Sequence, residues 1–212
     1  MATYESIIKI TGTVGDLVFY NLNGKNVVRK KSGFNKTAFK KNPSYEKVRQ
    51  NSSEFGHCSK MGKMIRGCLD LYIKKAGDPL LYQKFAKLMT EIKDLDTVSE
   101  RGKRTVEIGW QTEQGKKLLK EFQFGEIQNI RAEVEIKNQI LLINENVEAK
   151  KVIVVTIKMD SNDFGSVYAE EEVLLNHHTP PTLKTQFPDE DHLLHFVALK
   201  KDHDEITHMG FV

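Results

Sequence analysis

The sequence predicts an α+β fold, with an N-terminal β-hairpin, a central helical hairpin and a C-terminal antiparallel β-sandwich. Three observations predict this class. An Asn-Gly pair separates two strand-like runs near the start, apolar residues recur every three or four positions through the middle, and short strand-like segments about ten residues apart fill the last third. With 212 residues, of which 39% are hydrophobic, the chain can bury a core without disulfides.

The N-terminal hairpin is predicted over residues 17–29. Its two runs, 17–20 and 26–29, are rich in β-branched and aromatic residues. Asn23 and Gly24 between them tolerate the positive φ angles that a tight hairpin turn requires. Residues 32–41 follow, and we expect them to form an extended basic arm.

The middle of the chain predicts two antiparallel helices. Asn42 and Pro43 form a helix start, and the apolar spacing predicts a helix of roughly thirty residues that ends at Gly77. The expected seam of this helix comprises Tyr45, Val48, Ser52, Phe55, Ser59, Gly62, Ile65, Leu69 and Tyr72. Asp78 and Pro79 then open a second helix. Its expected buried face comprises Leu81, Phe85, Leu88, Met89 and Ile92. Beyond it we expect a strand over 105–109 and a short helix over 114–122.

The last third of the chain predicts a sandwich of six or seven strands. Residues 130–137 alternate between apolar and charged side chains, as expected of a strand that is buried on one face. The further expected strands are 139–144, 152–159, 166–173, 182–187, 192–200 and 207–212.

Charge is distributed unevenly along the chain. Residues 1–66 carry thirteen basic and four acidic residues, whereas residues 123–212 carry eight basic and sixteen acidic residues. We therefore divide the chain into a basic region with the hairpin and helices, 1–122, and an acidic β-sandwich domain, 123–212. Such an asymmetry indicates anionic partners or self-association.

Several functional classes lack their motifs in this sequence. It has no phosphate-binding loop, no nucleophile elbow and no Cys-x-x-Cys pair. No apolar run approaches the ~20 residues that cross a bilayer, and the start lacks a signal-peptide pattern. Cys58 and Cys68 lie ten residues apart on one expected helix, which favours two reduced thiols. We expect a cytoplasmic protein, or a virion protein if the chain comes from a phage.

Two patterns leave metal chemistry open as an alternative. Late histidines stand among acidic residues: His177, His178, His192, His195, His203 and His208, beside Asp189, Glu190, Asp191, Asp202, Asp204 and Glu205. Residues 160–171 also match part of a calcium-binding loop. However, His192 and His195 are three apart and would point to opposite faces of a strand. Solvated histidines and an ordinary hairpin loop are the favoured interpretations, and we assign no metal ligand and no cofactor.

The candidate binding residues are basic and aromatic side chains of the arm and of a later loop: Arg29, Lys30, Lys31, Lys36, Lys40, Lys41, Phe34, Phe39, Arg101, Lys103 and Arg104. Lysine and arginine neutralise phosphates and aromatic rings stack on bases, so the set fits a nucleic acid. The favoured interpretation is an arm whose aromatic side chains anchor it on a neighbouring subunit while its lysines stay in water, or an arm that is simply solvated.

The first 65 or so residues resemble a known family. The residues that carry the resemblance are Gly12-x-x-Gly15-x-x-Val18-Phe19-Tyr20, Asn23-Gly24-Lys25-x-Val27-Val28-Arg29-x-Lys31, and Asn42-Pro43 with Val48, Arg49 and Phe55. This pattern is similar to that of small uncharacterised proteins of Bacteroidota and, more loosely, to that of phage-encoded proteins. The resemblance brings no activity and no catalytic residue with it, and its phage side implies a virion or assembly role.

These observations favour a structural or interaction protein that is not an enzyme. We expect its basic hairpin and arm to dock on an acidic surface, such as the β-sandwich of a second copy. Opposed fields of this kind steer association and fix orientation. The alternatives are a nucleic-acid-binding protein and, less favoured, a metal-dependent enzyme.

Overall fold

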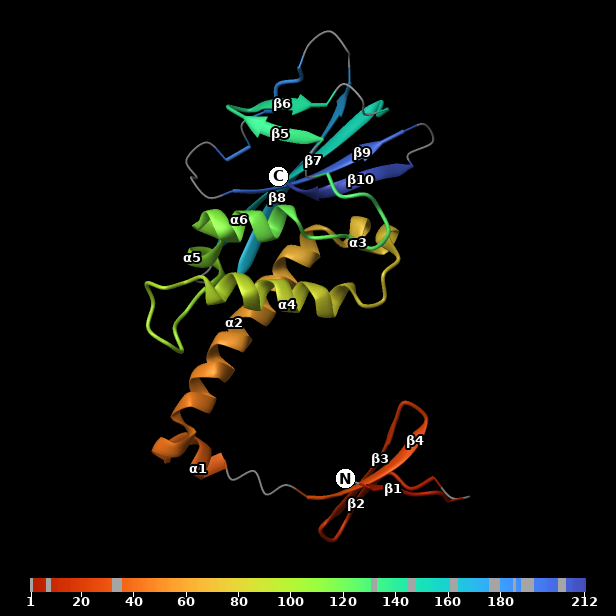
Figure 1. Ribbon diagram of the computed structural model, residues 1–212, viewed down its shortest axis with the longest axis vertical. Helices are drawn as coiled ribbons and strands as arrows, with labels where there is room; N and C mark the ends of the chain where they lie inside the picture. Colours follow the sequence, from red (N-terminus) through yellow and green to blue (C-terminus); the bar gives the residue numbers. More distant parts are fainter. Residues whose placement is uncertain are drawn as a thin grey trace. The chain divides into compact units, whose positions relative to one another are not determined.

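The computed structural model describes residues 2–6, 9–31, 36–130, 133–144, 148–160, 164–175, 180–184, 186–187, 193–201 and 205–212 (Figure 1). It contains helices and antiparallel sheets, which confirms the α+β class. The chain divides into two compact units. We call residues 1–46 the N-terminal unit and residues 47–212 the main unit.

The N-terminal unit is built on a four-stranded antiparallel sheet. Its strands are β1 (Ala2–Thr3), β2 (Gly12–Val14), β3 (Leu17–Leu22) and β4 (Lys25–Lys30), in the order β1-β4-β3-β2. The predicted turn is confirmed, because Asn23 and Gly24 have φ angles of 50° and 81°. The side chain of Asn21 accepts a hydrogen bond from the Gly24 amide at 3.0 Å and closes this turn. Helix α1 (Lys36–Lys41) and the short 3-10 turn η1 (Pro43–Tyr45) complete the unit.

The helices of the main unit follow the predicted order. They are α2 (Glu46–Cys68), α3 (Asp70–Ala76), α4 (Leu81–Asp94), α5 (Val106–Gln111) and α6 (Glu113–Lys120). The long predicted helix is interrupted at Leu69 and ends at Gly77, which has a φ of 64°. The predicted face of α4 is buried, from Leu81 to Ile92. Helices α2 and α4 are antiparallel, since Glu54 contacts Lys93 and Cys58 contacts Met89.

The predicted seam of the long helix is wrong in its first half. Val48 and Phe55 are exposed, and the buried positions are Glu54, Cys58 and Met61. The predicted seam and the observed buried face differ by a rotation about the helix axis. Because an acidic residue lies at the centre of the buried face, apolar spacing alone did not indicate that face. From Gly62 onward the predicted seam and the buried face agree.

The predicted strand over 105–109 is also wrong. Thr105 caps the N-terminus of α5, where its hydroxyl accepts a hydrogen bond from the Ile108 amide at 3.4 Å. Val106 and Trp110 are buried on the core side of this short helix. Burial against α4 decides the conformation here and overrides the β preference of threonine and valine. The second expectation for this region is confirmed, because α6 covers most of 114–122.

Among the described residues of the main unit, six strands follow the helices. They are β5 (Val134–Lys137), β6 (Ile140–Ile143), β7 (Lys151–Asp160), β8 (Gly165–Leu174), β9 (Leu194–Lys200) and β10 (Ile206–Phe211). The order β10-β9-β7-β8 makes an antiparallel sheet, and β5 pairs with β6. The strand expected over 182–187 is reduced to one bridge, between Thr182 and Ile140. Residues 185 and 131–132, within expected strands, lie outside the described residues.

The sheet β10-β9-β7-β8 has a hydrophobic core on each face, in a sandwich-like arrangement. Figure 1 shows β5 and β6 on one side of it and the helices on the other. Val152 and Val154 of β7 point toward β5 and β6, whereas Ile153 and Val155 pack with α2 and α4. The division into compact units falls between residues 46 and 47, whereas the division at 122 and 123 was predicted from charge alone. The helices share a core with the sheet because residues that alternate along one strand serve both layers.

The two cysteines are reduced in this structure and buried. Both lie on α2, as the sequence predicted. Burial raises the pKa of Cys58 to about 11 and also raises the pKa of Cys68. Thiols of this kind are protonated at neutral pH and react slowly.

Candidate functional site

The basic candidates of the N-terminal unit lie on β4 and on α1. Arg29 and Lys30 end β4, and Lys31 follows it. Residues 36–41 are helical, which corrects the expected extended arm over this part. The chain there is rich in helix-forming residues, and the Ala38 carbonyl accepts a hydrogen bond from the Asn42 amide at 2.8 Å. Phe34, with the rest of 32–35, lies outside the described residues.

The lysines of α1 and the aromatic ring of Phe39 differ in exposure. Lys36, Lys40 and Lys41 are exposed. Phe39 is half-buried and meets the ring of Tyr45 edge to face, with 6.0 Å between the ring centroids. This aromatic side chain anchors α1 on the following turn, while the lysines remain in solvent.

The second group of candidates, on the loop after α4, makes polar contacts within the main unit. Arg101 donates to the Asn51 side chain at 2.9 Å, and Lys103 pairs with Glu100 at 2.9 Å. Arg104 donates two hydrogen bonds to Glu54, at 2.8 Å from Nε and 2.7 Å from Nη2. The structure therefore brings the loop onto α2.

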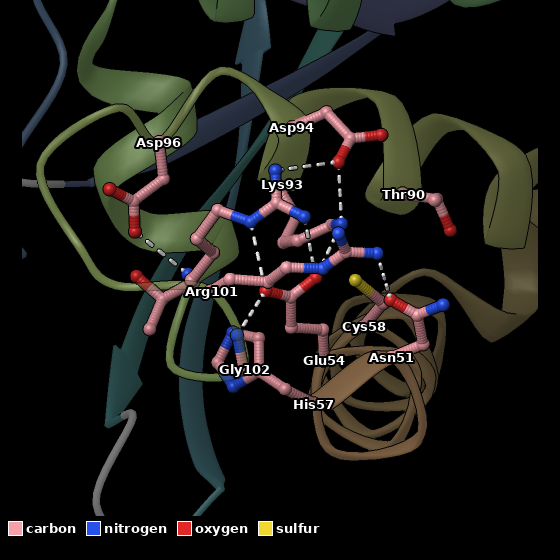
Figure 2. A network of polar contacts seen from close by, with 12 residues as sticks. Asn51, Glu54, His57, Cys58, Thr90, Lys93, Asp94, Asp96, Arg101 and Gly102 are labelled. Carbon is pink, nitrogen blue, oxygen red and sulfur yellow. Dashed lines mark hydrogen bonds and ion pairs between the residues drawn. The ribbon is translucent and has the colours of Figure 1, made fainter. Parts of the chain in front are cut away.

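Glu54 is the centre of this polar network, which Figure 2 shows from close by. It is only 3% exposed, and it also accepts hydrogen bonds from Lys93 Nζ at 2.9 Å and from the Gly102 amide at 2.7 Å. Lys93 is buried as well, and its ammonium group also donates to Asp94 at 2.5 Å. Asp96, nearby, accepts hydrogen bonds from backbone amides of the same loop, including that of Thr105 at 2.9 Å. The network fixes the loop to α2 and α4.

The charges of this network stabilise one another. The guanidinium of Arg104 is the main cause that lowers the pKa of Glu54 to about 2, against the opposing effect of burial, and Lys93 and the Gly102 amide contribute further. For Lys93, burial disfavours the charged form, but its hydrogen bonds to Asp94 and Glu54 outweigh burial and raise its pKa. Both groups are therefore charged at neutral pH.

The low pKa of Glu54 predicts a loss of stability in acid. The carboxyl binds a proton in the unfolded chain near pH 4.5 and in the folded chain only near pH 2. Its stabilisation, about 3 kcal/mol, is present above pH 4.5 and is lost as the pH falls toward 2. Urea unfolding of the wild type and of Glu54→Gln, followed by the fluorescence of Trp110 at several pH values, measures this. The difference between the two proteins should shrink below pH 4.5, and a constant difference would contradict the assignment.

His57 lies beside this network and joins α2 to the start of α5. Its Nε2 accepts a hydrogen bond from the Val106 amide at 3.0 Å and lies 2.9 Å from Oε2 of Glu107. Neither oxygen of Glu107 has a hydrogen-bond partner among the described groups, although both are buried. One ring nitrogen cannot accept from Val106 and donate to Glu107 at once, so the position of a single proton decides which contact forms.

A cavity of about 420 Å³ opens next to His57, between α2, the loop and Phe164. Three of the nitrogen-bearing side chains that line it are engaged with neighbouring groups. Arg104 binds Glu54, His57 accepts from Val106, and Lys60 Nζ lies 4.4 Å from the centroid of the Phe164 ring. We therefore interpret these side chains as holding the helices together.

Sequence reasoning missed Glu54, His57 and Lys93. A signal for Glu54 was present, because it is the only acidic residue between Glu46 and Asp70, in an otherwise basic stretch. It also precedes Cys58 by four residues, which places both on the same face of a helix. Nothing in the sequence indicated Lys93, since its partner lies 39 residues away.

The late histidines lie largely outside the described residues. His177, His178, His192 and His203 belong to that part, as do residues 161–163 of the calcium-like loop. His195 is on β9, where Nδ1 lies 3.2 Å from the hydroxyl of Thr156, and burial lowers its pKa. Among the described residues, no three His, Cys, Asp or Glu side chains lie close enough together to hold a metal ion.

Acidic residues of the main unit gather on the edge strand β8. Glu170, Glu171 and Glu172 are consecutive there, and β8 has no basic residue. Glu172 pairs with Lys151 of β7 at 2.9 Å, and Glu171 accepts from the Lys184 amide at 3.0 Å. Glu170 is exposed.

Within the described ranges, no helix is both long and apolar enough to span a membrane. Comparison with known proteins gives no relative, because no protein family model, no curated protein and no solved structure matches this chain.

Proposed function

We propose that this protein is a non-enzymatic interaction protein that assembles with further copies of itself through its basic N-terminal unit. The observation that carries the proposal is the sheet of that unit. Among the described side chains of residues 1–46, only Val27 is a buried hydrophobic residue.

Apolar side chains lie on both faces of this sheet. Residues that are directly opposite in an antiparallel pair share a face. Val18 and Tyr20 of β3 therefore lie on one face with Val27, and Leu17 and Phe19 lie on the other. A small sheet needs a covered apolar face to be stable. A partner that covers one face supplies the burial that the unit itself does not provide.

The charge of the N-terminal unit indicates the chemistry of its partner. Residues 1–46 contain eight basic and three acidic residues, and Lys25, Lys30 and Lys31 are exposed at or beyond the ends of β4. An acidic partner surface is attracted to such a unit and oriented by it. The acidic C-terminal part of a second copy, residues 123–212, has the required sign. The loose resemblance to phage-encoded proteins supports the same proposal of an assembly role.

A nucleic acid is the alternative partner, favoured by the exposed lysines of α1. It requires exposed cations that can neutralise phosphates. Lys36, Lys40 and Lys41 meet this requirement, whereas Arg104 of the second candidate group is committed to a buried carboxylate. The observed contacts therefore support the arm more than the loop in this role.

Light scattering during size-exclusion chromatography tests the proposal. We expect oligomers at low salt that dissociate as the salt concentration rises, because exposed charges are screened. The triple variant Lys25→Glu, Arg29→Glu, Lys30→Glu should be monomeric at concentrations where the wild type assembles. The control variant Lys75→Glu, Lys117→Glu reverses exposed charges of the main unit and should assemble normally. A wild type that is monomeric at every salt and protein concentration would overturn self-assembly, and a gel shift with DNA or RNA at low salt would favour the alternative.

A further inference from the structure

We infer that the surface that receives the N-terminal unit is the outer edge of β8 on a second copy. The inference rests on the proposed self-assembly and specifies the surface of the second copy that takes part in it. Three features of β8 carry it, namely its free edge, its exposed apolar side chains and its charge.

Strand β8 ends the order β10-β9-β7-β8, so only one of its edges is paired with β7. Among the described residues, no segment continues the ladder on the other edge. The strand is ten residues long, whereas natural edge strands are usually short or interrupted. A row of backbone donors and acceptors is therefore available to a strand from another chain.

Strand β8 exposes several large apolar side chains to solvent. Val167 is 60% exposed, Tyr168 51% and Leu174 66%. These residues lie toward both ends of the strand, with the three glutamates between Tyr168 and Leu174. Exposed apolar side chains beside a free edge indicate a surface that a partner covers.

The glutamates disfavour one register of pairing with β8 of a second copy. Antiparallel pairing of two β8 strands centred on Glu171 would place glutamate against glutamate, and like charges directly opposite each other are destabilising. A strand or sheet edge with basic side chains is favoured instead. Glu170 and Glu172 are both exposed, and Glu172 also pairs with Lys151.

The N-terminal unit offers a matching edge. One of its two edge strands, β2, carries Val14, which is 63% exposed and lies directly opposite Leu17. Leu17 in turn lies opposite Lys30, so an apolar pair and a basic residue follow one another across the same face. The apolar residues can pack on Val167 or Leu174, while Lys30, two strands away on β4, contributes to the positive charge that attracts the acidic centre of β8.

Disulfide trapping between two separately purified chains tests this contact. One chain carries Val14→Cys and the other Leu174→Cys, and the native cysteines stay in place because both are buried. We expect a mixed dimer under mild oxidation, seen on a non-reducing gel and lost on reduction. The control chain carries Val98→Cys, at a position that is 84% exposed and remote in sequence from β8. The inference is wrong if the Leu174→Cys and Val98→Cys chains form the mixed dimer with the Val14→Cys chain to the same extent, or if neither forms it.

Charge reversal separates this inference from the proposed function. Glu170→Lys with Glu172→Lys should weaken self-association at least about tenfold, while Glu91→Lys with Glu126→Lys, which changes the net charge equally, should not. Circular dichroism spectra and melting curves confirm that both variants fold. If the β8 variant assembles as well as the wild type while the variant of Lys25, Arg29 and Lys30 does not, the docking surface is wrong and the proposed function stands. If neither variant changes the assembly of the wild type, both fail.

Discussion

Replacing Glu54 by leucine should lower the free energy of unfolding by about 3–5 kcal/mol, the range found when one member of a buried ion pair is removed. The carboxylate accepts hydrogen bonds from Lys93, from Arg104 and from the Gly102 amide. Without it, Lys93 keeps its positive charge in a buried site with Asp94 as its remaining acidic partner there. Urea unfolding monitored by Trp110, the single tryptophan of the chain, gives the measurement.

Two companion variants show whether the loss comes from an uncompensated charge. Glu54→Leu combined with Lys93→Met removes the buried cation as well and should recover part of the stability, because apolar residues of similar size often replace buried ion pairs without cost. Glu91→Gln removes one partner of an exposed pair, 3.5 Å from Lys87, and should change stability by less than about 1 kcal/mol. A loss from Glu54→Leu as small as that from Glu91→Gln would show that the network contributes little.

Replacing Gly109 by alanine should destabilise the main unit by about 3 kcal/mol or more, the upper end of the cost of overpacking. A methyl group at this position would lie 1.9 Å from the carbonyl oxygen of Ile92, on α4. The obstacle is backbone, which cannot rotate aside, so α4 and α5 would have to separate. Gly115 repeats this arrangement one helix later, where a methyl group would lie 2.2 Å from the Gly109 carbonyl oxygen.

Gly56 provides the matched control for this substitution. It also lies inside a helix, but a methyl group there meets no atom within 4 Å. Gly56→Ala should therefore raise the stability by about 0.5–1 kcal/mol, because alanine is the better helix former. Thermal melting of the two variants should move in opposite directions. A melting temperature for Gly109→Ala equal to that of the wild type would mean that α4 and α5 are not held at this distance.

The sequence allowed the fold class and most elements to be predicted, because those depend on local patterns. The Asn23-Gly24 turn, the buried face of α4 and the long strand β7 follow from turn chemistry and from hydrophobic spacing. The errors arose where contacts across the chain decide the structure. The rotation of α2 depends on Lys93, and the helical state of 106–111 depends on the close approach of Gly109 to α4.

The candidate site was predicted by residue type, and the structure separates its members by their contacts. Net charge could not show that Arg104 faces a buried carboxylate while Lys30, Lys31 and Lys36 remain exposed. That distinction requires the three-dimensional position of Glu54, fifty residues before Arg104 in the chain. The two basic segments are alike in composition. The first remains exposed, whereas the second is held by a buried carboxylate.

The alternation of β7 between two cores also sets how the main unit comes apart. Adjacent residues such as Val152 and Ile153 belong to opposite hydrophobic cores. Strand β7 therefore cannot leave one core without also exposing the apolar residues of the other. Melting of residues 47–212 is then a single cooperative event, in which the helices and the β5–β6 pair lose protection from proteases together.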